Sequence, residues 1–217
     1  MGRAKIKRGS TNVDMTAMCD VAFLLLSFFI LTTKFKPSEA VEVKPPSSVA
    51  NKIASDKYQF LVSINKEGNV FIQMSDDIKG NVIDELSSAR NLNLSSQDKA
   101  LFKNSQYVAT PLNQLTQFIR LRPEEIGKVN LTGVPYDSTN NELQAWINAA
   151  VNANKSNPVN WQIKGDNQAK YSAFRDVINA FKKNEVFKYQ LVTNPAGIPA
   201  GSELEKKNRE SKGTVEE

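Results

Sequence analysis

The feature that most constrains this chain is an apolar stretch near its N-terminus that carries one carboxylate. Residues 12–36 read NVDMTAMCDVAFLLLSFFILTTKFK, and Asp20 stands just before an uncharged, mostly apolar run of 11 residues, Val21 to Leu31. A run of that length is too short to cross a bilayer and fits the hydrophobic region of a secretory signal peptide better. A helix from Asp14 to Thr33 has 20 residues and a length of about 30 Å, which matches the hydrocarbon thickness.

Two observations favour a spanning helix over residues 14–33 and count against the signal peptide. Asp20 lies within the segment, and the exit, residues 32–36, lacks a cleavage site of two small residues separated by one. The leader of residues 1–13 carries four bases and no acid (Arg3, Lys5, Lys7 and Arg8), against two bases just after the segment. By the positive-inside rule we expect the leader in the cytoplasm and the residues beyond about 34 on the other side of the membrane.

Asp20 is the candidate functional residue of the segment. A carboxylate at the centre of a membrane helix costs roughly 2.5 to 3.5 kcal/mol, and such residues usually face a protein interior and mark a proton or ion path. On a 3.6-residue helix, Thr16 and Ser27 share the stripe of Asp20, so hydroxyls flank the acid on its own face. The alternative is that Asp20 lies near enough to the helix start to reach headgroup water. One helix cannot shelter its own carboxylate, which implies a larger membrane partner.

Composition excludes several classes of function. The chain has 217 residues, 40% of them hydrophobic, with no histidine and one cysteine, Cys19. Histidine-based catalysis, most zinc sites and an internal disulfide are therefore excluded, and no phosphate-binding glycine loop is present. Of the net charge of +5, the leader supplies +4, and no basic stripe interleaved with aromatic residues follows. We expect no enzyme, no cofactor, no metal and no nucleic-acid partner.

The remainder predicts a linker over residues 34–57, an α+β domain over 58–194 and a disordered tail over 195–217. In the linker, AVEVKPPSS suits a short added strand and a plain spacer equally well. Alternating apolar residues around the turn NKEGN predict a hairpin, VNLTGV (residues 129–134) predicts a strand, and Thr139 with Glu142 predicts a capping box before a helix. Then come a strand followed by a turn (NWQIKGD), a helix stripe from Tyr171 to Phe181 and a final strand (VFKYQLVTN). The predicted fold is a mixed sheet with helices on one face.

The run from Asp14 to Leu26, DMTAMCDVAFLLL after a basic leader, resembles the motif of the ExbD/TolR family of biopolymer transporters. The family pattern has a proline after the position of Thr16, and Ala17 replaces it here. The resemblance implies an inner-membrane energy transducer, in which a homodimer sits inside a pentamer of an ExbB-like multi-span protein and drives a TonB-like or Tol protein. It also implies that Asp20 is the proton carrier and Asp14 a secondary acid.

The resemblance covers residues 3–74 and 128–193 and leaves the middle unassigned. Residues 75–128 are longer than compact members of the family need, and they predict a helical insertion. Ile78, Val82 and Leu86 indicate one helix; Thr110 and Pro111, as N-cap and first residue, indicate another. A padding role for the insertion is favoured over a dedicated binding role.

Two hypotheses from different classes follow. In the first, the chain is the proton-driven subunit of an ExbB-ExbD type motor that energises TonB-dependent transport, with a TolR-like envelope-maintenance motor as the variant. In the second, it is a membrane-anchored scaffold or binding module whose acid has no proton role. The substitution Asp20→Asn separates them, because only the motor requires a titrating group.

Overall fold

The computed structural model describes residues 15–33, 41–49, 54–126, 129, 131–137, 140–197 and 201–203. The chain divides into two compact units, Met1–Pro37 and Ser38–Glu217, each described here by itself. The predictions made for the leader, for Asp14 and for most of the tail lie outside the described residues.

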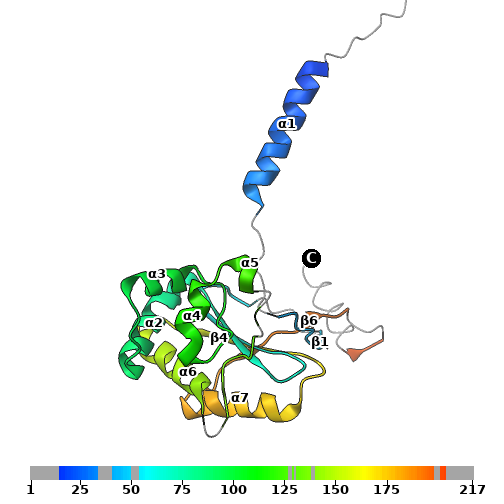
Figure 1. Ribbon diagram of the computed structural model, residues 1–217. Coiled ribbons are helices and arrows are strands. Elements are labelled where there is room, and N and C mark those ends of the chain that lie inside the picture. The colour runs from blue at the N-terminus through cyan, green and yellow to red at the C-terminus, as the bar shows by residue number, and fades with distance from the viewer. Residues whose placement is uncertain are drawn as a thin grey trace, which may run out of the picture. The chain divides into compact units, whose positions relative to one another are not determined.

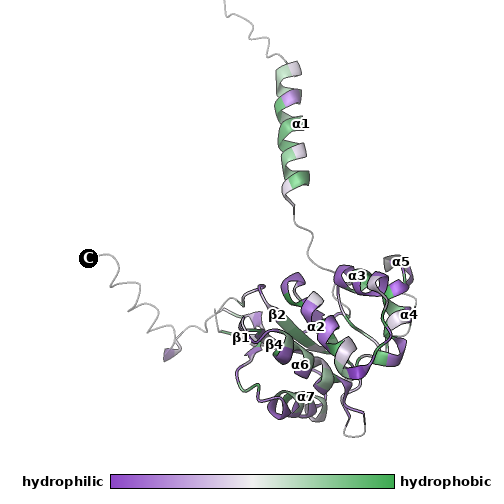
Figure 2. Ribbon diagram, turned by 90° about the vertical axis from the view of Figure 1, so that its left-hand side faces the viewer, coloured by the Kyte–Doolittle hydropathy of each residue, from purple (hydrophilic) through white to green (hydrophobic). Residues whose placement is uncertain are grey.

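Within the described residues of the first unit, 15–33, there is one helix, α1 (Met15–Thr32). By length and composition it is apolar enough to cross a membrane, and Figure 2 shows it as hydrophobic over most of its length. Its 18 residues correspond to about 27 Å. The fold class therefore holds for this unit: one N-terminal apolar helix.

The second unit is built on a mixed sheet with the strand order β3-β2-β4-β5. Strands β2 (Gln59–Ile64) and β3 (Val70–Met74) form the predicted hairpin. Strand β4 (Asn160–Gly165) runs parallel to β2, and β5 (Gln190–Leu191) runs parallel to β4. Since β2 and β4 are parallel neighbours, their carboxyl ends meet at the same edge of the sheet.

Three helices, α2 (Asp76–Arg90), α6 (Glu142–Ala153) and α7 (Tyr171–Lys183), enclose a core with the sheet (Figure 1). Strand β2 shows why this works: Phe60, Val62 and Ile64 are completely buried, while the residues between them are half-buried. Such alternation is what a strand with one covered face requires. The predicted mixed sheet with helices is confirmed.

The helical insertion is also confirmed, but its internal structure differs from the prediction. It contains α3 (Ser96–Asn104), which was not predicted, then a short 3-10 turn (Leu112–Gln114), α4 (Leu115–Arg120) and α5 (Pro123–Ile126). Pro111 precedes the 3-10 turn as its N-cap instead of opening an α-helix. The Arg120 guanidinium donates to both carboxylate oxygens of the buried Asp98, at 2.8 and 3.0 Å, and so joins α4 to α3.

The strand predicted over residues 129–134 is wrong. Residues 131–135 carry no strand, and Gly133 has φ +80°, which interrupts extended backbone. The amide of Val134 donates to the Val70 carbonyl at 2.7 Å, but Val108 already forms a bridge with Ile72 on that edge of β3. No room is left there for a regular neighbouring strand.

Two further predictions need correction. The final strand is shorter than the run VFKYQLVTN, because only β5 joins the main sheet, and β6 (Asn194–Pro195) pairs instead with β1 (Ser47–Ser48). The N-cap of α6 is Asn141, whose Oδ1 accepts from the Gln144 amide at 2.8 Å. The predicted partner, Thr139, lies outside the described residues. Glu142 accepts from the Leu112 amide at 2.7 Å and so holds the insertion to α6.

Candidate functional site

The carboxylate of Asp20 lies on a helix whose described side chains are not buried. Between residues 15 and 33, Asp20 is the only acid and no base is present. At 100° per residue, Thr16 and Ser27 fall within about 40° of Asp20, so α1 places the three predicted polar residues on one stripe. An acid on an otherwise apolar helix is the kind of residue that commonly marks an ion or proton path in membrane proteins.

Hydroxyls along α1 are bonded to the backbone of their own helix. The Ser27 hydroxyl donates to the Leu24 carbonyl at 2.9 Å, and Thr32 donates to the Phe28 carbonyl at 2.8 Å. Back-bonding of this kind satisfies the donor and leaves the oxygen able to accept. Ser27, on the stripe of Asp20, therefore has its hydroxyl donor satisfied without water.

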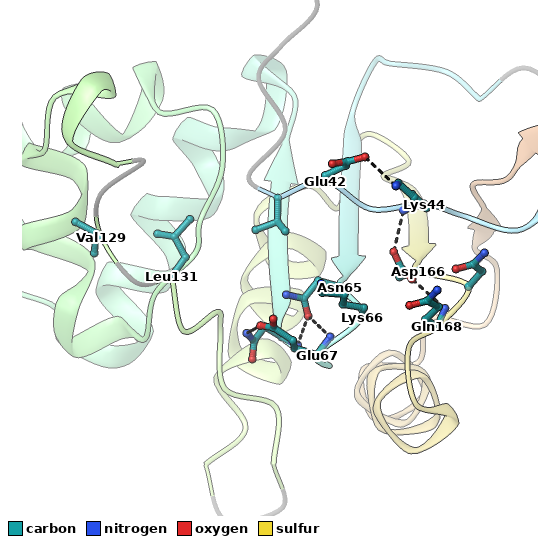
Figure 3. A pocket seen from close by; sticks show the side chains of 12 residues that line it. Glu42, Lys44, Asn65, Lys66, Glu67, Val129, Leu131, Asp166 and Gln168 are labelled. Atoms are coloured by element: carbon teal, nitrogen blue, oxygen red, sulfur yellow. Dashed lines mark hydrogen bonds and ion pairs between the residues drawn. The ribbon is translucent and has the colours of Figure 1, made fainter.

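A second candidate site lies in the other unit, at the edge where the parallel strands β2 and β4 end. It is a pocket of about 530 Å³. Figure 3 shows Glu42 and Lys44 on one side of it, with Asn65 and Asp166 on the turns that follow the two strands. The carboxyl ends of parallel strands are a common place for a ligand. Sequence reasoning identified both turns but did not bring them together.

One wall of the pocket is the segment of residues 41–49, which was predicted as part of the linker. Its Lys44 amide donates to Asp166 Oδ2 at 2.9 Å, and the Lys44 carbonyl accepts from the Asn167 amide at 3.0 Å. Val43 in the same segment is only 6% exposed. Further along, β1 pairs with β6. The sequence left open whether AVEVKPPSS is a short added strand or a plain spacer. In the described residues the segment packs against the domain as a tether, and it ends in a two-residue strand.

The turns of the pocket are organised by two side chains. Asn65 Oδ1 accepts from the backbone amides of Glu67 and Asn69, at 3.0 and 2.8 Å, and shapes the hairpin turn. Asp166 accepts from the backbone amides of Lys44 and Gln168, and these hydrogen bonds lower the pKa of its carboxyl. Asp166 is therefore ionised at neutral pH and acts as the anchor for the tether.

The chemistry that this pocket offers is polar binding. Its lining mixes two lysines, three carboxylates and several amides, with Val129 and Leu131 on one side. Among the described residues no group of three acids, cysteines or histidines gathers into a metal site. The pocket can hold a polar ligand or a peptide, and the docked tether forms part of its boundary.

Comparison with known proteins identifies the family. The family model described as biopolymer transport protein ExbD/TolR matches residues 7–196, a range that includes α1, the insertion and the whole sheet. The chain belongs to the ExbD/TolR family. Members of this family are membrane-associated biopolymer transport proteins. The match runs through residues 75–128, which the resemblance seen in the sequence left unassigned.

One curated relative is the biopolymer transport protein exbD2 of Vibrio cholerae serotype O1 (strain ATCC 39315 / El Tor Inaba N16961). It is 31% identical over 72 residues, which cover 33% of this chain and 53% of the relative. The chain thus spans about half the length of the curated relative that it matches. No solved structure matches the chain.

Proposed function

We propose that this ExbD/TolR protein is the proton-responsive subunit of a membrane motor of the ExbB-ExbD type, with Asp20 as the proton carrier. The observation that carries the proposal is a single acid, on a stripe with Thr16 and Ser27, in an otherwise apolar helix long enough to span a bilayer. The family of biopolymer transport proteins supports it. Helix α1 crosses the inner membrane with the leader in the cytoplasm, and the domain that begins near residue 58 is periplasmic.

The partners follow from the need to shelter the acid. Two copies of α1 side by side bring like carboxylates together, so one of them has to be neutral while the other is ionised. A surrounding ring of a multi-span, ExbB-like protein supplies polar groups to one acid and a dry wall to the other. This asymmetry is what lets a proton move from one side to the other and turn or rock the pair. We therefore propose a homodimer inside a pentameric partner, with Asp14 as a secondary acid and a TonB-like protein as the recipient of the motion.

The docked tether gives this motor a defined reach. From Thr33 to Val41 the chain has eight peptide units, which extend to at most about 29 Å. If the docked segment is released, the chain from Thr33 to Tyr58 has 25 units and reaches up to about 90 Å. Docking at Asp166 therefore decides how far the domain can move from the end of α1.

The decisive experiment replaces Asp20 by Asn in the full chain, which keeps the shape and removes the titration. We expect assembly with the partner ring to persist while nutrient uptake driven by the membrane potential is lost. Asp20→Glu should retain part of the activity. Cys19→Ser, about 100° around the helix from Asp20, is the matched control and should leave activity unchanged. Full activity of Asp20→Asn would refute the motor and leave the membrane-anchored scaffold as the better account.

A TolR-like role in envelope maintenance is the second candidate, because the family includes both branches. Identification of proteins that co-purify with the full chain in mild detergent distinguishes them. A TonB-like partner supports the first assignment, and a Tol partner supports the second. A monodisperse monomer without a multi-span partner would contradict both.

A further inference from the structure

We propose that the insertion of this chain carries a groove that takes a phospholipid acyl chain at the surface of the membrane from which the domain is suspended. The inference goes beyond the proton role of Asp20, and it rests on the proposed function only in requiring α1 to lie in that membrane. It concerns α3, α4 and α5, for which the sequence predicted no more than padding.

The groove has the chemistry of an amphiphile site. Its volume is about 310 Å³, at the lower end of the range of roughly 300 to 1,000 Å³ for ligand pockets. Five large apolar side chains line it: Leu101, Phe118, Ile119, Leu121 and Ile126. None of its lining residues is charged. Apolar walls of this extent with no ionic group match a hydrocarbon chain better than a charged metabolite.

One side of the groove is polar but neutral. Gln106 and Tyr107 belong to it, next to the end of α3. Tyr107 also contacts Phe118 through its ring, with centroids 6.0 Å apart, so its body belongs to the apolar wall. Burial raises the pKa of the Tyr107 hydroxyl, which therefore stays protonated and able to donate. A tyrosine with an apolar body and a donor at the tip is the residue type enriched at the membrane interface.

The groove lies close to the point at which the tether enters the domain. Tyr107, which lines the groove, also lines a small hollow on the sheet together with Val41, the first described residue of the tether. Val41 and Val129, the latter just beyond α5 in the chain, line the polar pocket. Because Tyr107 and Val41 line the same hollow, this part of the insertion lies at the edge of the domain where the tether enters it.

Tether length then allows this edge to reach the lipid. The eight peptide units from Thr33 to Val41 hold Val41 within about 29 Å of the end of α1. A tether this short keeps the bilayer surface at high effective concentration around the groove. Leu101, which lines the groove and is 37% exposed, is available for contact with lipid.

The chain's own tail is a poor occupant. Residues 204–217 read LEKKNRESKGTVEE and contain two large apolar residues, Leu204 and Val215. They cannot fill five apolar contacts without bringing charges into an uncharged groove. A second copy of the chain or a partner helix remains as an alternative that the experiment distinguishes.

The test uses the full chain with Cys19→Ser, in nanodiscs of phosphatidylethanolamine and phosphatidylglycerol. A nitroxide is placed at one of three positions: Gln106→Cys beside the groove, Leu26→Cys on α1, and Lys188→Cys, an exposed site outside the insertion. The accessibility of each nitroxide to oxygen, which partitions into lipid, is compared with its accessibility to a water-soluble nickel chelate. We expect the ratio at 106 to shift towards that at 26 and away from that at 188. Leu101→Asp should abolish the shift, whereas Leu191→Asp, at a residue 55% exposed on β5, should not.

Each outcome has a distinct meaning. A lipid-like ratio at 26 with a water-like ratio at 106 overturns the groove proposal and leaves the motor intact. A water-like ratio at both positions overturns both. Low accessibility to both reagents at 106 means that protein covers the groove, and this also refutes the lipid assignment. A lipid-like ratio at 106 that survives Leu101→Asp would show that the contact does not involve the groove.

Discussion

The contact that holds the tether against the domain can be weakened at one side chain, Val43. It is 6% exposed, and replacing it by Ala removes two buried methyl groups. At about 0.8 kcal/mol for each buried carbon, the docked state loses about 1.6 kcal/mol relative to the released state. Because 1.4 kcal/mol is a factor of ten, the population of the released segment rises about tenfold.

Amide hydrogen exchange measures this change directly. The Lys44 amide, bonded to Asp166, and the Asn167 amide, bonded to the Lys44 carbonyl, are protected only while the segment is docked. In Val43→Ala both should exchange about tenfold faster, while amides in the centre of β2 keep their protection. Val49→Ala is the matched control, since Val49 lies at the end of the same segment and is 36% exposed. Equal exchange of these amides in the two variants would refute the idea that burial of Val43 holds the tether.

Three further predictions test other parts of the structure. Hydrogen bonds from Arg120 and Ser95 hold the pKa of the Asp98 carboxyl well below its usual range. The ionised carboxylate therefore contributes its full stabilisation of the fold above the unfolded pKa of about 3.9, and this contribution is lost as pH falls below that value. The stability difference between wild type and Asp98→Asn, measured by urea unfolding, should shrink below about pH 4. Gly133→Ala places a Cβ 2.8 Å from the Val70 carbonyl oxygen, at a residue with φ +80°. It should lower the free energy of unfolding by about 1 to 3 kcal/mol. Gly197→Ala is the control: no atom lies within 4 Å of its added Cβ, so the melting temperature should not change. Reporter fusions at Gly9 and Ser202 should report opposite sides of the membrane, and a common side for both would restore the signal-peptide interpretation.

Local patterns were sufficient to predict the elements whose partners are close in sequence. The hairpin followed from alternation on either side of NKEGN, and α2 and α7 followed from apolar residues at helical spacing. Helix α3 was missed although its signal is visible: Ser95 and Asp98 form a capping box in which each side chain accepts from the other's backbone amide. Only Leu101 and Phe102 are large and apolar within α3, which is too few to reveal a period.

Contacts between segments that are far apart in the sequence determine the features that local sequence patterns did not predict. Residues 129–134 have strand-like composition, but Val108 pairs with Ile72 at the edge of β3 through backbone hydrogen bonds of 2.7 and 3.0 Å, so that edge is already occupied. The polar pocket was not predictable for a related reason. Lys44 and Asp166, which close it, are 122 residues apart, and no local pattern in either segment indicates the other. Asp20, by contrast, is predicted as a functional residue from a short window, because an acid in an apolar helix conflicts with its own surroundings, and this stays a prediction.

The strength of tether docking can be compared with the energy that the proposed motor receives. A proton that crosses the full membrane potential releases about 2.3 kcal/mol for every 100 mV. The contribution of Val43 to docking, about 1.6 kcal/mol, is of the same order. One proton transferred at Asp20 would therefore supply at least as much free energy as the two Val43 methyl groups add to docking, but less than the roughly 5 to 15 kcal/mol needed to unfold a domain. If the proposed motor pulls on the domain through residues 41–49, the Val43→Ala variant should lower the force that the docked segment can transmit.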